Sequence, residues 1–331
     1  MNILITGIHG FVGSNLVKSL SKEHSIYGID IVAPEKEGVL KTFSWDDLEN
    51  NALPEVDAII HLAGKAHDTK NMADADVYFK VNTELTKMIY DYYLRSSAKK
   101  FIFFSTVKSA ADRVEGDFLT EDIVPNPVGA YGESKIAAEN YILANLPKGE
   151  ILNQVQNDRK EVKDDVASND KQVYIFRPCM IHGQGNKGNL NLLYQVVSKG
   201  IPWPLGAFEN KRSFVAIDNL CFAVAGFLEK NIESGIYHIA DDESLSTNEL
   251  INSMCEAMGR KSRIWKIPRG FMNFVARIGT LLHLPLNNER LQKLTENYVV
   301  SNQKLKKALG IENLPITARK GIIRTIQSFR K

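Results

Sequence analysis

Cysteine is scarce in this 331-residue sequence, which contains only Cys179, Cys221 and Cys255. Their odd number, their wide separation and the lack of a Cys-x-x-Cys pair argue against a disulfide framework and a zinc site, and favour a reducing compartment. Met1 leads directly into the apolar run Ile3–Ile5, which leaves no room for a signal peptide. We therefore expect a cytoplasmic protein with no metal site.

Long apolar runs are also missing. No uncharged apolar stretch reaches the roughly 18 residues that a transmembrane helix requires. The nearest candidate, Phe271–Leu286, contains Arg277 and His283. We predict that this segment is a helix packed on a second domain, with contact to a membrane surface as the alternative, and we expect no membrane as a partner.

Charge of neither sign dominates the sequence. Its 41 lysines and arginines are balanced by 39 aspartates and glutamates, which gives a formal net charge of +2. A nucleic-acid-binding protein gathers basic residues on one face or in one segment, so we expect no nucleic acid as a partner, while a local basic pocket for phosphate stays open. The 44% hydrophobic and 24% charged residues are those of an ordinary globular protein, and the length fits one large or two intimately joined domains.

The first half alternates short apolar runs with longer helical patterns, which predicts parallel βαβ units. Helical stretches lie near Phe11–Lys22, Val77–Ser96 and Ala130–Asn145. The expected strands are short, apolar and largely β-branched or aromatic, and they cover Asn2–Thr6, Ser25–Ile29, Ala58–Leu62, Phe101–Ser105 and Val173–Phe176. The predicted fold class is α/β, a doubly wound parallel (Rossmann) sheet with its ligand site at the carboxyl ends of the strands.

Two domains are expected. Residues 1–178 form the dinucleotide-binding domain, with a polar surface insertion at about 148–171 that has too few apolar residues to order itself. Residues 179–331 form a smaller α+β domain, and whether part of it returns to the first domain is left open. In that part a strand over Gly235–Ile239 precedes Ser246-Thr-Asn-Glu249, a capping-box pattern that opens a helix through Met258.

A glycine-rich turn, Gly7-Ile-His-Gly10-Phe-Val-Gly13, follows the first expected strand and precedes a helix. Glycine suits this place because the chain bends tightly, the backbone approaches a pyrophosphate closely, and helix and strand pack without a side chain between them. The helix N-terminus offers free N–H groups and a partial positive charge to phosphates. A glycine triplet alone is a weak signal, and its position between strand and helix strengthens it.

Asp30 ends the second expected strand, about 20 residues after the glycine turn, where an acid can bind the ribose 2′-hydroxyl of NAD. A 2′-phosphate would be repelled by this carboxylate. The next basic residue, Lys36, is not adjacent in sequence. We therefore expect NAD as the cofactor, with NADP less favoured.

Tyr131 and Lys135 lie four residues apart, on one face of an expected helix. Lowering a tyrosine pKa from near 10 to about 7 requires roughly 4 kcal/mol of preferential phenolate stabilisation, which an adjacent ammonium and the positive nicotinamide ring can provide. Such a phenolate can remove a proton from a substrate hydroxyl. Ser105 and Thr106 end the fourth expected strand, which points a hydroxyl into the same crevice.

These motifs occur in an order that is similar to one family. Together with motifs in the C-terminal half, they resemble the extended short-chain dehydrogenase/reductase family, the NAD-dependent epimerase/dehydratases of nucleotide-sugars. The resemblance covers nearly the whole chain except the insertion. It rests on Gly7-x-x-Gly10-Phe11-x-Gly13, Asp57-Ala-Ile-Ile-His61-Leu-Ala63, Val81-Asn82, Phe104-Ser105-Thr106, Tyr131-Gly-x-Ser-Lys135, Arg177-Pro178, the segment Asn210–Leu220, and Val299-Val-Ser-Asn followed by Leu309-Gly310.

The resemblance implies roles for individual residues. Thr106, Tyr131 and Lys135 would be catalytic, with Ser105 as the fallback for Thr106. The implied substrate-binding residues are Thr106, Lys108, Asn189 and Arg212, with Arg212 on the nucleotide diphosphate. The implied cofactor-binding residues are Gly7, Gly10, Phe11, Val12, Gly13, Asp30, Leu62, Ala63, Gly64, Asn82, Ser105, Tyr131, Lys135 and Pro178.

The family also implies a nucleotide-sugar substrate, UDP-linked, and a homodimer formed through the helices near Val77–Ser96 and Ala130–Asn145. Its 4,6-dehydratase branch needs an Asp-Glu pair directly after the catalytic threonine, where this sequence has Val107 and Lys108, so a dehydratase is not expected. The histidines at 61, 182 and 238 are interpreted as structural, and His61 and His67 have no third ligand spaced for a metal.

Three functional hypotheses follow from these residues. The leading one is C4 epimerisation of a UDP-hexose or UDP-N-acetylhexosamine through a 4-keto intermediate, without net redox change. The alternative is an NAD(P)H-dependent 4-ketoreductase of a UDP-4-keto-6-deoxy sugar, of the kind found in surface-polysaccharide biosynthesis. A non-catalytic dinucleotide-binding regulator is disfavoured because Thr106, Tyr131 and Lys135 are all present.

Overall fold

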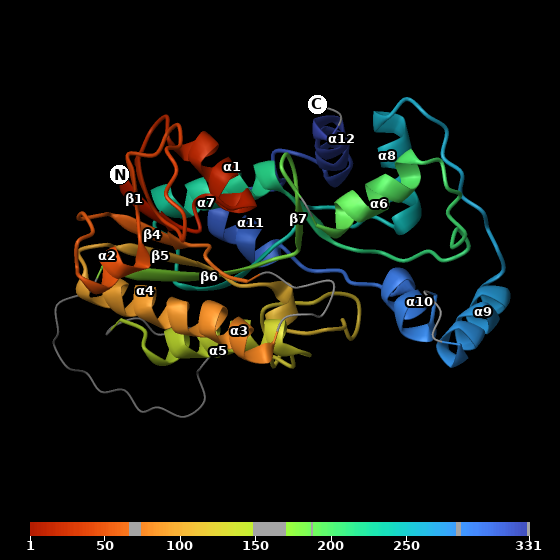
Figure 1. The fold of residues 1–331 in the computed structure, drawn as a ribbon, viewed down its shortest axis with the longest axis horizontal. Coiled ribbons are helices and arrows are strands. Elements are labelled where there is room, and N and C mark those ends of the chain that lie inside the picture. The colour runs from red at the N-terminus through yellow and green to blue at the C-terminus, as the bar shows by residue number, and fades with distance from the viewer. Residues whose placement is uncertain (66–73, 148–169, 187, 283–285, 330–331) are drawn as a thin grey trace.

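A seven-stranded parallel sheet forms the centre of the computed structural model, which describes residues 1–65, 74–147, 170–186, 188–282 and 286–329 (Figure 1). Across the sheet the order is β3 (Lys41–Phe43), β2 (Ser25–Ile29), β1 (Asn2–Thr6), β4 (Ala58–His61), β5 (Lys100–Phe104), β6 (Gln172–Pro178) and β9 (Gly235–Ile239). The chain leaves β1 for β2 and β3 on one side and returns to β4 on the other, so the topological switch point lies between β1 and β4. The predicted α/β fold class is confirmed.

The strands are almost entirely apolar because helices cover both faces of the sheet. Ile3 and Ile5 point to one face, where they pack with α1 (Phe11–Leu20), α7 (Ile217–Glu229) and α11 (Gln303–Leu309). Leu4 points to the other face, toward α2 (Trp45–Glu49), α4 (Leu85–Arg95) and α5 (Ala130–Ala144). Figure 1 shows the two helical layers above and below the sheet.

The helix expected over 77–96 is divided into three parts. They are α3 (Ala75–Tyr78), a π-helical turn η1 (Phe79–Glu84) and α4. The short β3 and α2 were not anticipated from the sequence, although Ser44 and Asp47 form a capping box at the start of α2. The expected insertion at 148–171 lies outside the described residues except for its last two positions.

The C-terminal part forms a smaller helical unit beside the sheet. In it α6 (Asn189–Ser198), α8 (Thr247–Ala257) and α12 (Ala318–Ser328) share a core, and β7 (Met180–His182) pairs with β8 (Phe214–Ala216). The predicted capping box at Ser246 and Glu249 is confirmed at the start of α8. The expected strand Gly235–Ile239 is β9, which pairs with β6 in the main sheet rather than lying within the smaller unit.

A helical pair extends from this unit at the end farthest from the sheet (Figure 1). It consists of α9 (Arg269–Leu281) and α10 (Asn288–Thr295), so the predicted helix over Phe271–Leu286 is confirmed with an earlier end. Within the described residues no helix is long and apolar enough to cross a membrane.

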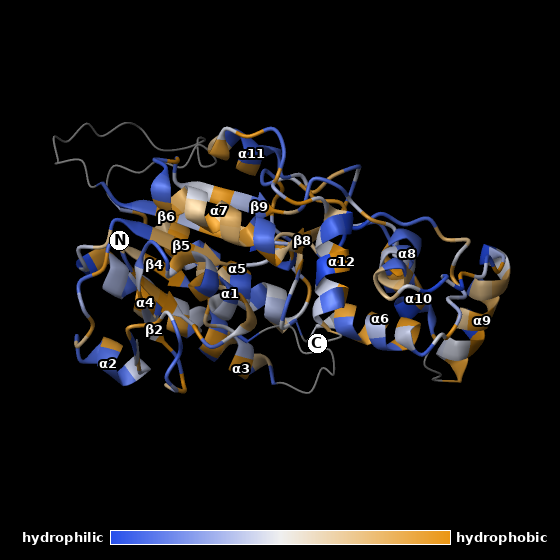
Figure 2. Cartoon of the chain, turned by 90° about the horizontal axis from the view of Figure 1, so that it is seen from above, coloured by the Kyte–Doolittle hydropathy of each residue, from blue (hydrophilic) through white to orange (hydrophobic). Residues whose placement is uncertain are grey.

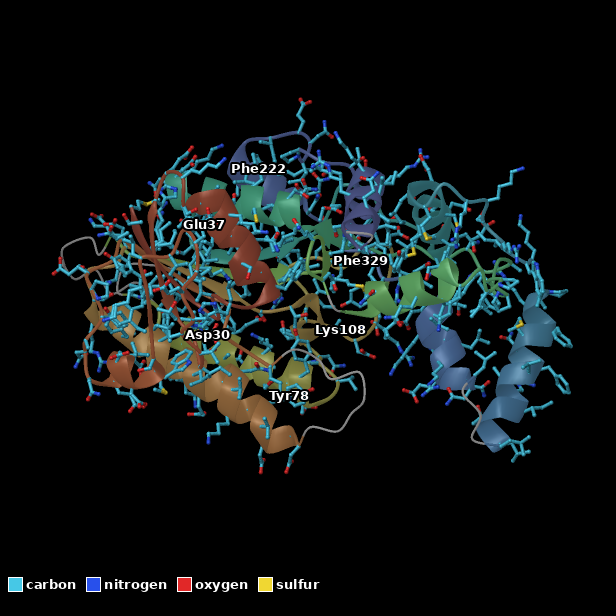
Figure 3. All side chains as sticks on the ribbon, turned by 45° about the horizontal axis from the view of Figure 1, so that its top comes forward. Asp30, Glu37, Tyr78, Lys108, Phe222 and Phe329 are labelled. Atoms are coloured by element: carbon cyan, nitrogen blue, oxygen red, sulfur yellow. The ribbon has the colours of Figure 1, made fainter. Side chains whose placement is uncertain are left out.

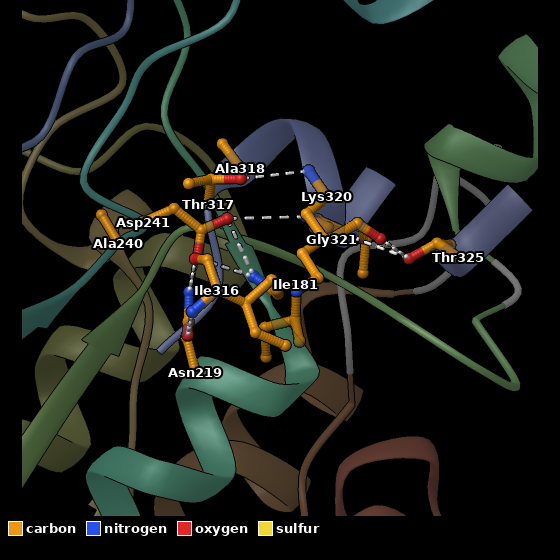
Figure 4. Close-up of polar contacts among 12 residues, drawn as sticks. Ile181, Asn219, Ala240, Asp241, Ile316, Thr317, Ala318, Lys320, Gly321 and Thr325 are labelled. Carbon is orange, nitrogen blue, oxygen red and sulfur yellow. Dashed lines mark hydrogen bonds and ion pairs between the residues drawn. The ribbon is translucent and has the colours of Figure 1, made fainter. Parts of the chain in front are cut away.

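A buried polar junction joins the two parts (Figure 4). Asn219, at the start of α7, donates from Nδ2 to the Asp241 carboxylate at 2.7 Å and to the Ile316 carbonyl at 2.7 Å. Its Oδ1 accepts from the Ile316 N–H at 3.1 Å, and the Ala216 N–H donates to Asp241 at 3.0 Å. One amide thus ties α7, the end of β9 and the segment before α12 together.

Candidate active site

The glycine turn after β1 has the geometry of a phosphate cradle. Gly7 has a φ of +68°, and a Cβ there would lie 2.9 Å from the Ala63 nitrogen at the end of β4. A Cβ on Gly13 would lie 2.6 Å from the Gly7 carbonyl oxygen. No side chain in the described part of the chain caps the N-terminus of α1. The turn therefore needs its glycines and leaves helix N–H groups available to an anion.

Asp30 lies at the end of β2 and is bonded to this turn. Its Oδ2 accepts from the His9 N–H at 2.9 Å and its Oδ1 from the Ile31 N–H at 2.8 Å. Lys36, which is distant in sequence, folds back so that Nζ donates to the Ile8 carbonyl at 2.8 Å and to the Ser14 hydroxyl at 2.7 Å. Burial lowers the Lys36 pKa and the charge of Asp30 opposes this shift. Lys36, although not adjacent to Asp30 in sequence, is therefore close enough in the fold for the two charges to interact.

The end of β4 carries the next part of the site. The Thr6 hydroxyl accepts from the N–H groups of Leu62 at 3.2 Å and Ala63 at 3.0 Å, which fixes the backbone beside Gly7. His61 is buried, with Nδ1 at 2.7 Å from the Thr6 hydroxyl and Nε2 at 2.9 Å from the Thr86 hydroxyl. Burial, helped by the charge of Lys135, holds the His61 pKa well below its usual value. A neutral ring with both nitrogens engaged has a structural role.

Gly64, Asn82 and Lys135 meet at the carboxyl edge of the sheet. A Cβ on Gly64 would lie 2.9 Å from Asn82 Oδ1 and 3.1 Å from Lys135 Nζ. Asn82 is held by the backbone of Lys65 and donates to the Ser134 hydroxyl at 3.0 Å. Lys135 Nζ donates to the Phe104 carbonyl at 2.8 Å, and burial lowers its pKa to about 8.

Tyr131 and Thr106 are joined by a hydrogen bond at the carboxyl edge of the sheet. The Thr106 hydroxyl, at the start of the 3₁₀ turn η2 (Val107–Ser109), hydrogen-bonds the Tyr131 phenol. Burial raises the Tyr131 pKa, and the bond to Thr106 opposes this effect. The Tyr78 ring lies edge-on to the Tyr131 ring at a centroid distance of 6.2 Å. Without a bound ligand, Tyr131 is therefore a protonated phenol that is hydrogen-bonded to the Thr106 hydroxyl.

A buried ionic network, missed by the sequence analysis, lies beneath these residues. Arg177 donates to Glu139 at 2.5 to 3.1 Å, and both side chains are almost fully buried. The Ser105 and Ser109 hydroxyls donate to the same carboxylate. The Ser105 side chain is thus engaged by Glu139, and Thr106 is the hydroxyl that reaches Tyr131. The signal was present in the sequence, since Glu139 follows Lys135 by four residues.

The expected substrate-binding residues lie on different elements, with Lys108 in the same 3₁₀ turn that Thr106 begins. Lys108 donates to Asp112 at 3.0 Å and its Nζ lies 4.5 Å from the centre of the Tyr298 ring. Arg212 pairs with Glu296 at 3.3 Å. Asn189 is the first residue of α6, and its side chain lies outside the described part of the structure. Figure 3 shows Asp30, Tyr78 and Lys108 on the part of the molecule that contains the sheet.

The remaining expected cofactor residues border the same edge. Phe11 and Val12 open α1 and are half-buried, Leu62 follows β4, and Pro178 is the buried last residue of β6. The row from Gly7 through Ala63 and Gly64 to Lys135 is continuous, since each neighbouring pair is in contact or adjacent in sequence. A dinucleotide fits this row, with pyrophosphate at the glycine turn, one ribose at Asp30 and the reactive ring near Lys135 and Tyr131.

One group of potential metal ligands occurs among the described residues, far from this edge. It consists of Glu23, His24 and Glu229. His24 directly precedes β2, so the group lies at the amino ends of the strands, opposite the crevice. The group is therefore separate from the candidate active site.

Comparison with known proteins gives a consistent result. The model of the NAD dependent epimerase/dehydratase family matches residues 3–151. The chain is 29% identical to the UDP-glucose 4-epimerase of Vibrio cholerae, over 99% of this chain and 95% of that protein. It is 28% identical to the GDP-6-deoxy-D-mannose reductase of Pseudomonas aeruginosa, over 77% of this chain and 79% of that protein.

The fold is shared with solved enzymes of similar size. The crystal structure of UDP-glucuronic acid 4-epimerase from Bacillus cereus in complex with NAD superimposes with a TM-score of 0.71 at 18% identity. The match covers 100% of this chain and 99% of that one, so both parts of the molecule share the fold.

Proposed function

We propose that the chain is an enzyme of the NAD-dependent epimerase/dehydratase family and that it catalyses C4 epimerisation of a UDP-hexose or UDP-N-acetylhexosamine through a 4-keto intermediate. The observation that carries this proposal is the direct bond between Thr106 and Tyr131, with Lys135 one helical turn away and against Gly64. That is the arrangement needed to move a proton at a sugar hydroxyl beside a bound dinucleotide.

NAD is the proposed cofactor. The glycine turn would hold the pyrophosphate, because a Cβ at Gly7 or Gly13 would fill that space. The Asp30 carboxylate would accept from ribose hydroxyls, and Lys135 would donate to the second ribose. The solved relative that contains NAD has the same fold over its whole length, which supports this assignment. When bound, NAD supplies a positively charged ring and a reversible hydride acceptor for C4.

Tyr131 is the proposed base. It would receive the proton of the 4-hydroxyl directly or through Thr106, whose hydroxyl can accept from the sugar while donating to the phenolate. Burial opposes ionisation of Tyr131 in the chain alone, so nearby positive charge is needed before it acts. The same proton returns to the 4-oxygen after the sugar has turned in the site, which leaves the protein unchanged.

The proposed substrate is UDP-linked because a relative aligned over 99% of this chain is named UDP-glucose 4-epimerase. Arg212 would bind the diphosphate. Its present partner Glu296 is partly exposed, so the guanidinium can exchange this pair for phosphate oxygens. Lys108 borders the crevice and is the second proposed substrate contact.

A 4-ketoreductase is the second candidate. It would use Thr106, Tyr131 and Lys135 once, in the direction that reduces a keto sugar. The similarity to a GDP-6-deoxy-D-mannose reductase favours it, at 28% identity over most of both chains. The two candidates differ in cofactor use, since an epimerase keeps its dinucleotide and a reductase exchanges it at every turnover.

The deciding experiment is to denature the purified protein and measure the dinucleotide it releases, alongside conversion of UDP-glucose and UDP-N-acetylglucosamine to their 4-epimers. Near-stoichiometric NAD and turnover without added cofactor support the epimerase. An empty site and NADH- or NADPH-dependent reduction of a 4-keto sugar support the reductase.

Tyr131→Phe abolishes either activity on this proposal, whereas Tyr141→Phe, on the same helix but bonded to Asp91, retains it. Full activity in Tyr131→Phe contradicts both.

The proposed assembly is a cytoplasmic homodimer formed through α4 and α5. Tyr90 and Tyr93 are buried in the core of the chain itself, so they are not available to such an interface. Tyr92 and Tyr141 are half-buried and remain the aromatic side chains that a partner can cover. Light scattering coupled to gel filtration distinguishes a mass near 37.1 kDa from twice that value.

A further inference from the structure

Helix α9 presents a broad apolar face to solvent. Five large apolar residues follow helical spacing on it, and two of them, Leu281 and Phe274, are 78% and 58% exposed. At 100° per residue they occupy an arc of about 100°, which is the width of a face that normally packs on a core. The five are Phe271, Phe274, Ile278, Leu281 and Leu282.

The packing of α9 uses a different face. Met272, Ala276 and Gly279 are its buried residues, and they face α10 and the loop at Leu205. A Cβ on Gly279 would overlap the Leu286 carbonyl, so the two helices of this pair approach closely. The expected packing of this helix on the second domain is therefore made by Met272, Ala276 and Gly279, and five other large apolar residues of the helix face outward. Figure 2 shows this helix at the end of the molecule, with apolar residues along its surface.

The stretch of sequence that contains α9 is basic, although Glu256 and Glu289 flank it. Between residues 257 and 288 the sequence contains six lysines and arginines and no aspartate or glutamate. Trp265, in the segment before α9, is 57% exposed. Arg277 lies beside the apolar arc on the helical wheel, next to Leu281. The six cations are Arg260, Lys261, Arg263, Lys266, Arg269 and Arg277.

We propose that α9 and the basic segment before it dock the enzyme on an anionic lipid surface. An exposed apolar face of Phe and Leu, flanked by Lys, Arg and Trp, has the composition of a helix that lies in the plane of a membrane interface. Anionic headgroups complement the six cations. A second copy of the chain packed on this face would bring two sets of like charges together without an acid in either segment.

The position of α9 suits this role. It lies at the end of the molecule remote from the Rossmann sheet, so a surface can contact it without covering the glycine turn (Figure 1). Binding to a membrane through α9 does not change the proposed reaction at Tyr131. The consequence is location: the enzyme works at a membrane surface.

The test is sedimentation of the full chain with vesicles of phosphatidylcholine alone or mixed with phosphatidylglycerol. We expect binding to the anionic vesicles and little to the neutral ones, with a loss on raising salt. Phe274→Ser combined with Leu281→Ser lowers binding by at least about tenfold, because two exposed apolar side chains that would insert into the lipid are removed. Arg277→Glu with Lys266→Glu has a similar effect.

Matched controls come from exposed residues elsewhere. Phe222→Ser on α7 and Lys320→Glu on α12 leave binding unchanged. Because all substituted side chains are exposed, circular dichroism and the activity in solution stay at wild-type values in every variant. The proposal is overturned if wild-type protein does not sediment with anionic vesicles, or if Phe222→Ser weakens binding as much as the α9 variant. It is also overturned if α9 mediates self-association, seen as a dimer mass that Phe274→Ser with Leu281→Ser converts to monomer.

Discussion

At the scale of single residues, burial shifts the pKa values of the ionisable groups in the candidate active site. Tyr131 and Lys135 sit in the same edge, and burial moves both pKa values toward the neutral form of each group. On the proposed function, Tyr131 therefore needs its hydrogen bond to Thr106 and the charge of a bound cofactor before it can act as a base. The chain alone is thus less reactive than the assembled site.

Thr106 and Ser105 differ in a way that kinetics can resolve. We expect Thr106→Val to lower kcat by about 10²–10³-fold, because the hydroxyl that bonds Tyr131 is lost. Ser105→Ala instead removes a bond to Glu139 and lowers the unfolding free energy by about 1–2 kcal/mol with a much smaller change in kcat. Steady-state kinetics and urea unfolding check both variants. Equal losses of kcat in the two at unchanged stability would contradict the assignment of Thr106.

Lys135 makes stability depend on pH in a defined window. Its pKa is about 8 in the folded chain and 10.5 when unfolded, so the unfolded state binds the extra proton between these values. Raising the pH from 8 to 10.5 therefore stabilises the wild type relative to Lys135→Met, by up to about 1.4 kcal/mol per pH unit. Urea unfolding of both cofactor-free proteins at several pH values measures this. A difference that does not change across the window would contradict the lowered pKa.

At the scale of elements, the site is a meeting of strand ends and one helix. β1 and β4 bring Gly7 against Ala63, and α5 carries Tyr131, Lys135 and Glu139 on one face. The Glu139–Arg177 pair fixes α5 to β6, and the serines bonded to it fix the turn that carries Thr106. Removing one charge of such a buried pair typically costs 3–5 kcal/mol, so this network sets the geometry of the crevice.

The glycine turn offers a test at this scale. Gly13→Ala places a Cβ 2.6 Å from the Gly7 carbonyl, so we expect α1 to shift, the unfolding free energy to fall by about 1–3 kcal/mol and dinucleotide binding to weaken. Gly270→Ala in α9 is the control, because a Cβ there has no neighbour within 4 Å. Thermal melts and the NAD content of each purified protein provide the readouts. Wild-type NAD content in Gly13→Ala would show that the turn tolerates the side chain.

At the scale of the whole molecule, the two parts are interleaved along the chain. The segment after β6 forms β7 and α6, returns to the sheet through α7 and β9, and leaves again for α8. The polypeptide chain therefore passes between the two parts several times, near the junction at Asn219. A polar group buried there affects both parts at once.

Asn219→Ala tests this coupling. It leaves the Ile316 carbonyl, the Ile316 N–H and one side of Asp241 without their partner, so we expect a loss of about 2–4 kcal/mol in unfolding free energy and one cooperative transition. Asn313→Ala, at an exposed position, changes stability by less than about 0.5 kcal/mol. Calorimetry decides between this result and two separate transitions, which would mean that the parts unfold independently.

The sequence by itself determined the features that are local along the chain. β1, the glycine turn and α1 follow one another without interruption, and Tyr131 and Lys135 share a face because four residues make about one helical turn. Apolar runs also report burial on both faces, which predicts a parallel sheet. These features depend on neighbours in sequence, so their spacing is sufficient to infer them.

Only the tertiary structure decided which distant residues meet. Lys36 reaches the turn beside Asp30, Glu139 finds Arg177, and β9 joins the main sheet, although nothing in their local patterns specifies these partners. The sequence also leaves the exposure of the apolar face of α9 undecided. The spacing of its apolar residues predicts such a face but does not show whether another element covers it. The physical reason is that a pattern records which side chains avoid water, whereas the partner of each depends on how the whole chain packs.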